Sequence, residues 1–154
     1  MAITLQSTFE SLDGAEVKWG WTEDSADYPD GTSIHEVAAT HHFGATIENG
    51  FGRGILIVIP ARPILTETFE HNAEQIGVLS DAINDEIIDT MTTDIEAGLR
   101  VIGQFAQSNM QRDFRRLQAE LVPLADSTIR RKGQEDRLIE SGHLMEQVLF
   151  KVET

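Results

Sequence analysis

Apolar residues recur at steps of three and four over a long stretch of this chain, and this spacing constrains the fold more than any other feature. The pattern begins at Thr66, is interrupted at Thr92-Thr93-Asp94, and ends at Pro123. Such spacing places apolar side chains along one face of an amphipathic α-helix. We therefore predict two long amphipathic helices in a helical region 64–122. Their apolar positions are Phe69, Ala73, Ile76, Leu79, Ile83, Ile87 and Ile88 in the first, and Ile95, Leu99, Ile102, Ala106, Met110, Phe114, Leu117 and Leu121 in the second.

The first 60 residues favour β-structure. Ala15 to Trp21 alternates apolar and polar residues, Ile3 to Leu5 resembles a short strand, and the β-branched run from Ile55 to Ile59 is the strongest strand signal. Pro60 and Pro63 stop that last strand. We expect the alternating strand to turn one apolar face inward, made of Ala15, Val17, Trp19 and Trp21.

A short helix is expected from Ile34 to His42, between the predicted strands. Ser33 can act as its N-cap, with Glu36 completing a capping box. Gly44 would end the helix in a left-handed conformation.

The C-terminal segment, 123–154, predicts three short elements. Ala125 to Lys132 is expected to form a helix ended by Gly133, Ser141 to cap another helical turn, and Gln147 to Val152 to form a closing strand. With no repeat or linker in view, we predict one α+β domain over residues 1–154. It consists of a small, mostly antiparallel sheet packed against the two long helices.

Acidic residues are concentrated in one part of the chain. The 154 residues include 26 Asp and Glu against 12 Lys and Arg, a net charge of −14. Residues 1–99 hold 18 acids and three bases (−15), whereas residues 100–154 hold eight acids and nine bases (+1). This balance argues against generic affinity for nucleic acid or anionic membranes. The uneven distribution of charge between the two parts of the chain suggests either contacts between copies or one surface that is kept anionic.

Several features that resemble catalytic motifs fail on spacing. His35-Glu36 would need a second histidine at the position of Ala39 to bind zinc as a metalloprotease does. The glycines of 50–54 precede a strand rather than link a strand to a helix, so they do not form a nucleotide loop. The chain has no cysteine, which excludes thiol chemistry and disulfides. We therefore expect no enzyme activity, no cofactor and no metal site.

Two stretches together resemble a known family. The first runs from Glu36 to Ala45 (EVAATHHFGA) and continues, after a glycine-bearing loop, with IPARPIL at Ile59 to Leu65. The second is PLADSTIRRKG at Pro123 to Gly133, followed by RLIESGHL at Arg137 to Leu144. These segments are similar to motifs of the neck, or tail-completion, proteins of tailed bacteriophages, related to the Mu-type virion morphogenesis proteins. The chain departs from them at His42, Ile64 and Glu140-Ser141.

The resemblance implies a structural virion protein at the head–tail interface, assembled in the host cytoplasm. It implies a ring of about six or twelve copies. The partners would be portal-side connector or adaptor proteins on one side and tail terminator or tail tube proteins on the other. Genomic DNA would pass through the lumen without sequence-specific binding, and an acidic lumen would repel its phosphates. No membrane is involved.

The candidate contact residues between subunits or rings come from the glycine-bearing loop, its flanks and the basic run near residue 130. The loop from Thr46 to Gly54 is a candidate arm, and Arg62 would sit at a fixed point between sheet and long helix. The basic run can equally be a solvated helix end. The candidates are Phe43, Ile47, Phe51, Arg53, Arg62, Arg130, Arg131 and Lys132.

Two other functions remain open. One is a tail-completion or virion-assembly factor that forms no neck ring. The other, of a different class, is an acidic regulatory protein that mimics DNA and binds a basic partner. Such a mimic would be monomeric or dimeric and would carry aligned surface carboxylates.

Overall fold

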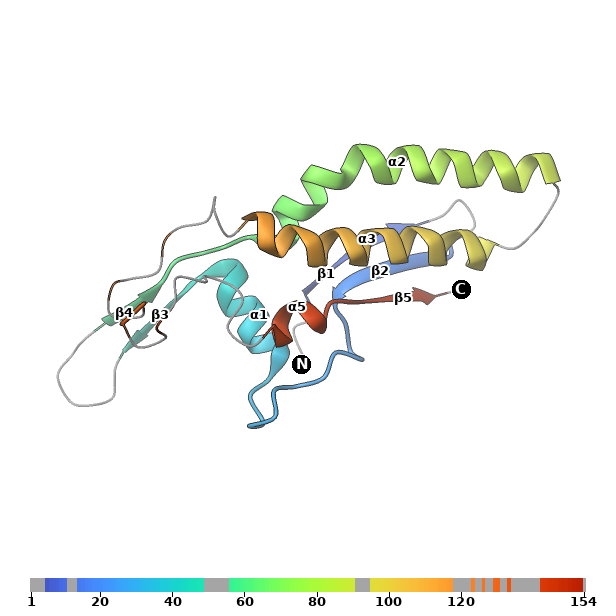
Figure 1. The fold of residues 1–154 in the computed structure, drawn as a ribbon. Helices are drawn as coiled ribbons and strands as arrows, with labels where there is room; N and C mark the ends of the chain where they lie inside the picture. Colours follow the sequence, from blue (N-terminus) through green and yellow to red (C-terminus); the bar gives the residue numbers. More distant parts are fainter. Residues whose placement is uncertain are drawn as a thin grey trace.

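The computed structural model describes residues 5–10, 14–48, 56–90, 95–117, 123, 126, 129–130, 133 and 142–153. Its class is α+β, as predicted, with two long helices, two small antiparallel sheets, a short C-terminal helix and a closing strand (Figure 1). The elements in chain order are β1 (Leu5–Glu10), β2 (Glu16–Trp21), α1 (Ile34–Phe43), β3 (Ala45–Glu48), β4 (Leu56–Ile59), α2 (Ile64–Thr90), α3 (Ile95–Leu117), α5 (His143–Glu146) and β5 (Leu149–Glu153).

The main sheet has the strand order β1-β2-β5, and both pairings are antiparallel. The first and last described strands therefore flank β2, which brings the two ends of the chain into one sheet. Helices α2 and α3 lie side by side above this sheet, and the second sheet, β3-β4, extends away from it (Figure 1). Among the described residues, no helix combines the length and the apolar character needed to cross a membrane.

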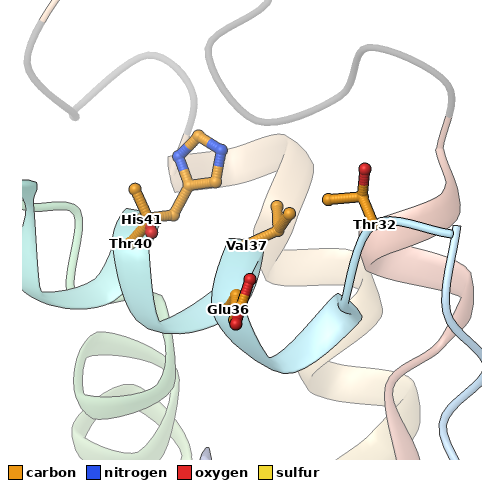
Figure 2. A pocket seen from close by; sticks show the side chains of 5 residues that line it. All are labelled: Thr32, Glu36, Val37, Thr40 and His41. Atoms are coloured by element: carbon orange, nitrogen blue, oxygen red, sulfur yellow. The ribbon is translucent and has the colours of Figure 1, made fainter. Parts of the chain in front are cut away.

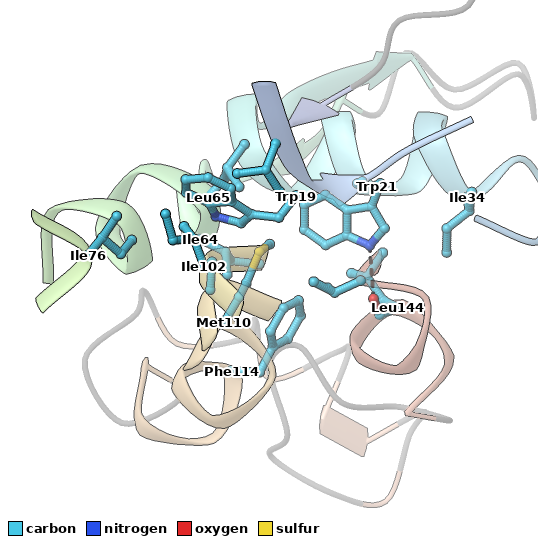
Figure 3. Packing of buried hydrophobic residues seen from close by; sticks show 14 of the residues in the cluster. Trp19, Trp21, Ile34, Ile64, Leu65, Ile76, Ile102, Met110, Phe114 and Leu144 are labelled. Carbon is cyan, nitrogen blue, oxygen red and sulfur yellow. Dashed lines mark hydrogen bonds between the residues drawn. The ribbon is translucent and has the colours of Figure 1, made fainter. Parts of the chain in front are cut away.

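The core lies between β2 and α3. The predicted face of β2 is confirmed, because Val17, Trp19 and Trp21 are at most 2% exposed and Ala15 is also buried. Figure 3 shows the two indole rings meeting side chains from α2, α3 and α5. The Trp21 Nε1–H donates to the carbonyl oxygen of Leu144 at 2.8 Å, which satisfies its polar atom in the core. The predicted α3 stripe is likewise buried at Leu99, Ile102, Ala106, Met110, Phe114 and Leu117.

The buried stripe of α2 differs from the predicted one. Phe69 is 40% exposed, although its ring stacks on Trp19 at a centroid distance of 6.1 Å, and Ala73 is exposed. Polar residues take part of the seam instead: the Asn72 Nδ2 atom donates to Asp113 of α3 at 3.0 Å and to the Thr68 carbonyl at 2.8 Å. Because the amide and carboxylate hydrogen-bond to each other, α2 and α3 can bury them beside the predicted apolar positions.

The strand predictions need three corrections. The first described strand covers Leu5–Glu10 and so extends beyond the predicted end at Leu5, with a register of six pairs to β2, whereas Ile3 and Thr4 of the predicted strand lie outside the described residues. The strand β3 was not predicted, and it pairs with β4 in a separate two-stranded sheet. The closing strand begins at Leu149 rather than Gln147, because α5 and its C-cap occupy the residues before it.

Helix α1 begins after Ser33 as expected, but the predicted capping box is absent. The Ser33 side chain makes no capping hydrogen bond. The Ile34 N–H instead donates to the Asp27 carboxylate at 2.9 Å. A carboxylate at a helix N-terminus satisfies an unpaired donor and complements the helix dipole, so a residue six positions before the N-cap replaces the local cap.

Parts of the C-terminal segment agree with the predicted elements. Asp126, Ile129 and Arg130 have helical backbone, and Gly133 has a φ of 73° with its N–H donating to the Ile129 carbonyl at 2.8 Å. These features fit a helix ended by Gly133. The predicted cap Ser141 lies outside the described residues.

Gly103 sets the distance between α3 and the sheet. A Cβ atom at this position would lie 2.3 Å from the Phe150 ring and 2.9 Å from Val17. We expect Gly103→Ala to lower the free energy of unfolding by about 1–3 kcal/mol, because a methyl group overfills this contact. Gly77→Ala on α2 is the matched control, since its Cβ meets nothing within 4 Å. It should raise stability by roughly 0.5–1 kcal/mol. Urea denaturation followed by circular dichroism measures both, and equal effects would contradict the prediction.

Lys18 neutralises two glutamates that face each other across the sheet. Glu16 and Glu153 are directly paired in the β2–β5 register, and the Lys18 ammonium contacts both carboxylates. Hydrogen bonds from Lys18 and Lys151 lower the pKa of Glu153 below its ordinary value of 4.5. This contribution to stability is therefore present at neutral pH and is lost as pH falls through the lowered pKa.

We expect Lys18→Met to lower the melting temperature at pH 7, because two like charges then oppose each other. The difference from the parent chain should shrink as pH falls through the lowered pKa of Glu153, because its carboxylate then loses the charge that Lys18 neutralises. Thermal melts at pH 3, 5 and 7 test this, and a difference that does not depend on pH would contradict it.

Candidate assembly surface

The two strands β3 and β4 form a projecting arm, and the name arm is used here for these two strands (Figure 1). The arm begins where α1 ends, at Gly44. This glycine has φ 73° and ψ 170°, a conformation almost restricted to glycine. A Cβ atom there would lie 2.7 Å from the Ile59 carbonyl oxygen and 2.8 Å from the Ala61 nitrogen. The lack of a side chain therefore lets the two ends of the arm meet.

Arg62 fixes the same point from inside the protein. Its backbone N–H donates to the His41 carbonyl at 2.7 Å, and its guanidinium Nη1 lies 3.5 Å from the His41 Nδ1 atom. The residue is only 2% exposed. The two segments that lie around residues 36–45 and 59–65 are thus joined at the base of the arm.

The arm exposes apolar side chains on both of its faces. In the register, Ile47 pairs with Ile57, and Thr46 pairs with Val58 on the opposite face. Ile47 and Ile57 are 47% and 45% exposed, whereas Leu56 and Val58 are 62% and 68% exposed. An isolated two-stranded hairpin is marginally stable in water, and exposed apolar patches mark interaction sites. The arm therefore has the properties of a surface that another molecule covers.

The apolar surface continues onto the end of α1. Phe43 is 65% exposed, and its ring contacts the edge of His42 at a centroid distance of 4.7 Å. Partial burial lowers the pKa of His42 from its ordinary value of 6.5. Its imidazole is consequently neutral at pH 7 and adds no charge beside Phe43.

The predicted contact residues fall into three groups. Phe43 and Ile47 lie on this exposed apolar surface, and Arg130 is exposed elsewhere in the chain. Arg62 is buried within the protomer, and its role as a contact between subunits stays a prediction. The other candidates lie outside the described residues: Phe51, Arg53, Arg131 and Lys132.

The predicted contact residues did not include Leu56, Ile57 and Val58, which form an unbroken run of exposed apolar residues in the arm. The signal was present, because the run from Ile55 to Ile59 has no polar alternation. A strand without alternation is apolar on both faces. In this chain both faces are exposed instead of being buried in the core.

A shallow hollow of about 300 Å³ lies on the outer side of α1. Figure 2 shows the Glu36 carboxylate and the His41 ring pointing in different directions from the helix, with Val37 between them. The hollow therefore brings no acid–base pair together. Within the described ranges, no three His, Asp or Glu side chains gather as a metal site. The residues around the hollow are Thr32, Glu36, Val37, Thr40 and His41.

Helix α2 carries an acidic stripe. The helix contains seven acidic residues and no Lys or Arg. Five of them are exposed and fall within about 60° on the helix circumference over roughly 27 Å, opposite the seam toward α3. Val78, which is 65% exposed, lies beside the stripe, about 20° beyond its edge on the helix circumference. The acidic stripe consists of Glu67, Glu70, Glu74, Asp81 and Asp85.

Comparison of this chain with protein-family models, with curated proteins and with solved structures finds no match.

Gly44→Ala should loosen the base of the arm. The new methyl group meets the β4 carbonyl and cannot adopt the backbone conformation without strain, so we expect a loss of roughly 1–3 kcal/mol in stability. Gly31→Ala is the matched control, because its φ of 84° is also positive but its Cβ meets nothing within 4 Å. Urea denaturation of both variants isolates the contact with β4. An equal loss in the two variants would show that the contact contributes nothing.

Proposed function

We propose that this chain is a structural protein of a tailed-bacteriophage virion that forms a ring in the neck and joins the portal side to the tail. The observation that carries the proposal is the arm. A projecting, doubly apolar hairpin is suited to grip a neighbouring subunit, and it offers no arrangement for catalysis. The resemblance to neck proteins supports the same function, because two of its motif segments meet at the base of this arm through Gly44 and Arg62.

The acidic stripe on α2 supports a lumen through which DNA passes. Carboxylates aligned along a helix repel phosphates, so DNA facing them slides without being held. Under this proposal the arm makes contacts between protein subunits, whereas the stripe faces the genome. A tail-completion or assembly factor would use the same arm without a permanent ring.

The acidic stripe also favours a second candidate, a regulatory protein that mimics DNA. Five exposed carboxylates in one line present a charge pattern that a basic DNA-binding protein can recognise. The arm favours the ring over the mimic, since a mimic has no need for an exposed apolar hairpin.

The mass of the purified chain tests the proposal. A neck protein should form closed rings of about six or twelve copies, visible by mass photometry and by negative-stain electron microscopy. A chain that stays monomeric or dimeric contradicts the ring and favours the mimic.

Charge reversal of the stripe separates the two functions further. Glu70→Lys combined with Glu74→Lys should leave the number of copies in the ring unchanged. Under the mimic hypothesis the same change removes binding to a basic partner. Loss of the ring in this variant would show that the stripe, rather than the arm, holds the copies together.

A further inference from the structure

The main sheet ends in an open strand. Among the described residues β5 pairs with β2 alone, so one side of its backbone has no strand beside it. All five of its residues are partly buried and none is fully buried. Phe150 and Val152 pack against the core cluster yet stay partly exposed. An unpaired edge with half-covered apolar side chains is a template for another strand.

The arm has the complementary properties. Within the described part of the chain, β4 pairs only with β3, which leaves its other edge open. All four residues of β4 are apolar, and Leu56, Ile57 and Val58 are exposed. By contrast, β3 carries Thr46 and Glu48. Pairing through the free edge of β4 would therefore bury more apolar side chain than pairing through β3.

We infer that β4 of one copy pairs along β5 of a second copy. The pairing rests on the self-association proposed above and names the surfaces that carry it. It joins the arm to a three-stranded sheet and makes a five-stranded sheet that spans two subunits. Main-chain hydrogen bonds supply affinity, and the apolar residues of β4 cover Phe150 and Val152.

The occupant is a second copy because this chain itself carries both halves of the contact. The arm and β5 lie at different places on the molecule (Figure 1). A contact between two different surfaces is heterologous, and it repeats from copy to copy until a ring closes. The lengths also agree, since β4 has four residues and β5 has five.

Site-specific cross-linking tests the pairing, and the absence of cysteine makes the chain suitable for it. One double variant carries Val58→Cys and Lys151→Cys. The control carries Val78→Cys and Lys151→Cys, because Val78 is exposed to a similar extent, 65% against 68%, but lies on α2. Each is prepared in light and heavy isotopic forms, mixed, treated with a short bifunctional maleimide and mapped by mass spectrometry.

The expected product is a link between residues 58 and 151 that joins light to heavy chains, with little product in the control. Rings that form without this link overturn the strand pairing but leave the proposed function standing. A link confined to one chain overturns it too, because the arm would then cover its own sheet. A chain that stays monomeric at every concentration overturns both the pairing and the ring.

A second measurement does not depend on cross-linking. Val58→Lys should weaken self-association by roughly tenfold or more, as loss of a central apolar contact does, while Val78→Lys should change it little. Circular dichroism confirms that both variants fold, and sedimentation velocity measures the association. Equal association of the two variants would overturn the proposal.

Discussion

The close approach of α3 to the sheet determines the rest of the structure. At Gly103 the helix has no side chain, so the Phe150 ring and Val17 lie against its backbone. A three-stranded sheet has too little area to form a core alone, and this contact supplies the second layer. It also packs β5 against the core, and the β2–β5 pairing ties the last described strand to residues near the start of the chain.

A core built this way leaves the arm outside it. The indoles of β2 and the apolar stripe of α3 are buried against each other in the core. The chain between α1 and α2 runs through a separate hairpin, β3-β4. Gly44 and Arg62 close that hairpin at its base with backbone contacts. The arm is therefore fixed at one end, and its apolar residues have no place in the core of the same protomer. This division between a packed core and an exposed arm makes self-association the natural use of the surface.

Local patterns predicted the elements whose partners lie in the core. The alternation of β2 and the stripe of α3 both reflect burial on one side, so their faces could be read from spacing alone. The run that became β4 could not be resolved in this way, because a strand without alternation looks the same whether a core or another molecule covers it. The polar seam was also hidden, since Asn72 and Asp113 are acceptable in the core because Asn72 donates to Asp113, which also accepts from Arg116. Neither residue signals its partner in the sequence.

Part of the acidic excess in the first 99 residues can be assigned to one surface of the structure. Five of the 18 acidic residues in 1–99 lie in the acidic stripe of α2, on the side opposite its seam with α3. Acidic residues aligned in this way repel one another, and a protein that needed only solubility would distribute them over its surface. The aligned stripe alone suits either a lumen or a DNA mimic. We propose the lumen rather than the mimic, because an exposed apolar hairpin lowers the solubility of a free monomer and suits a surface that another subunit covers.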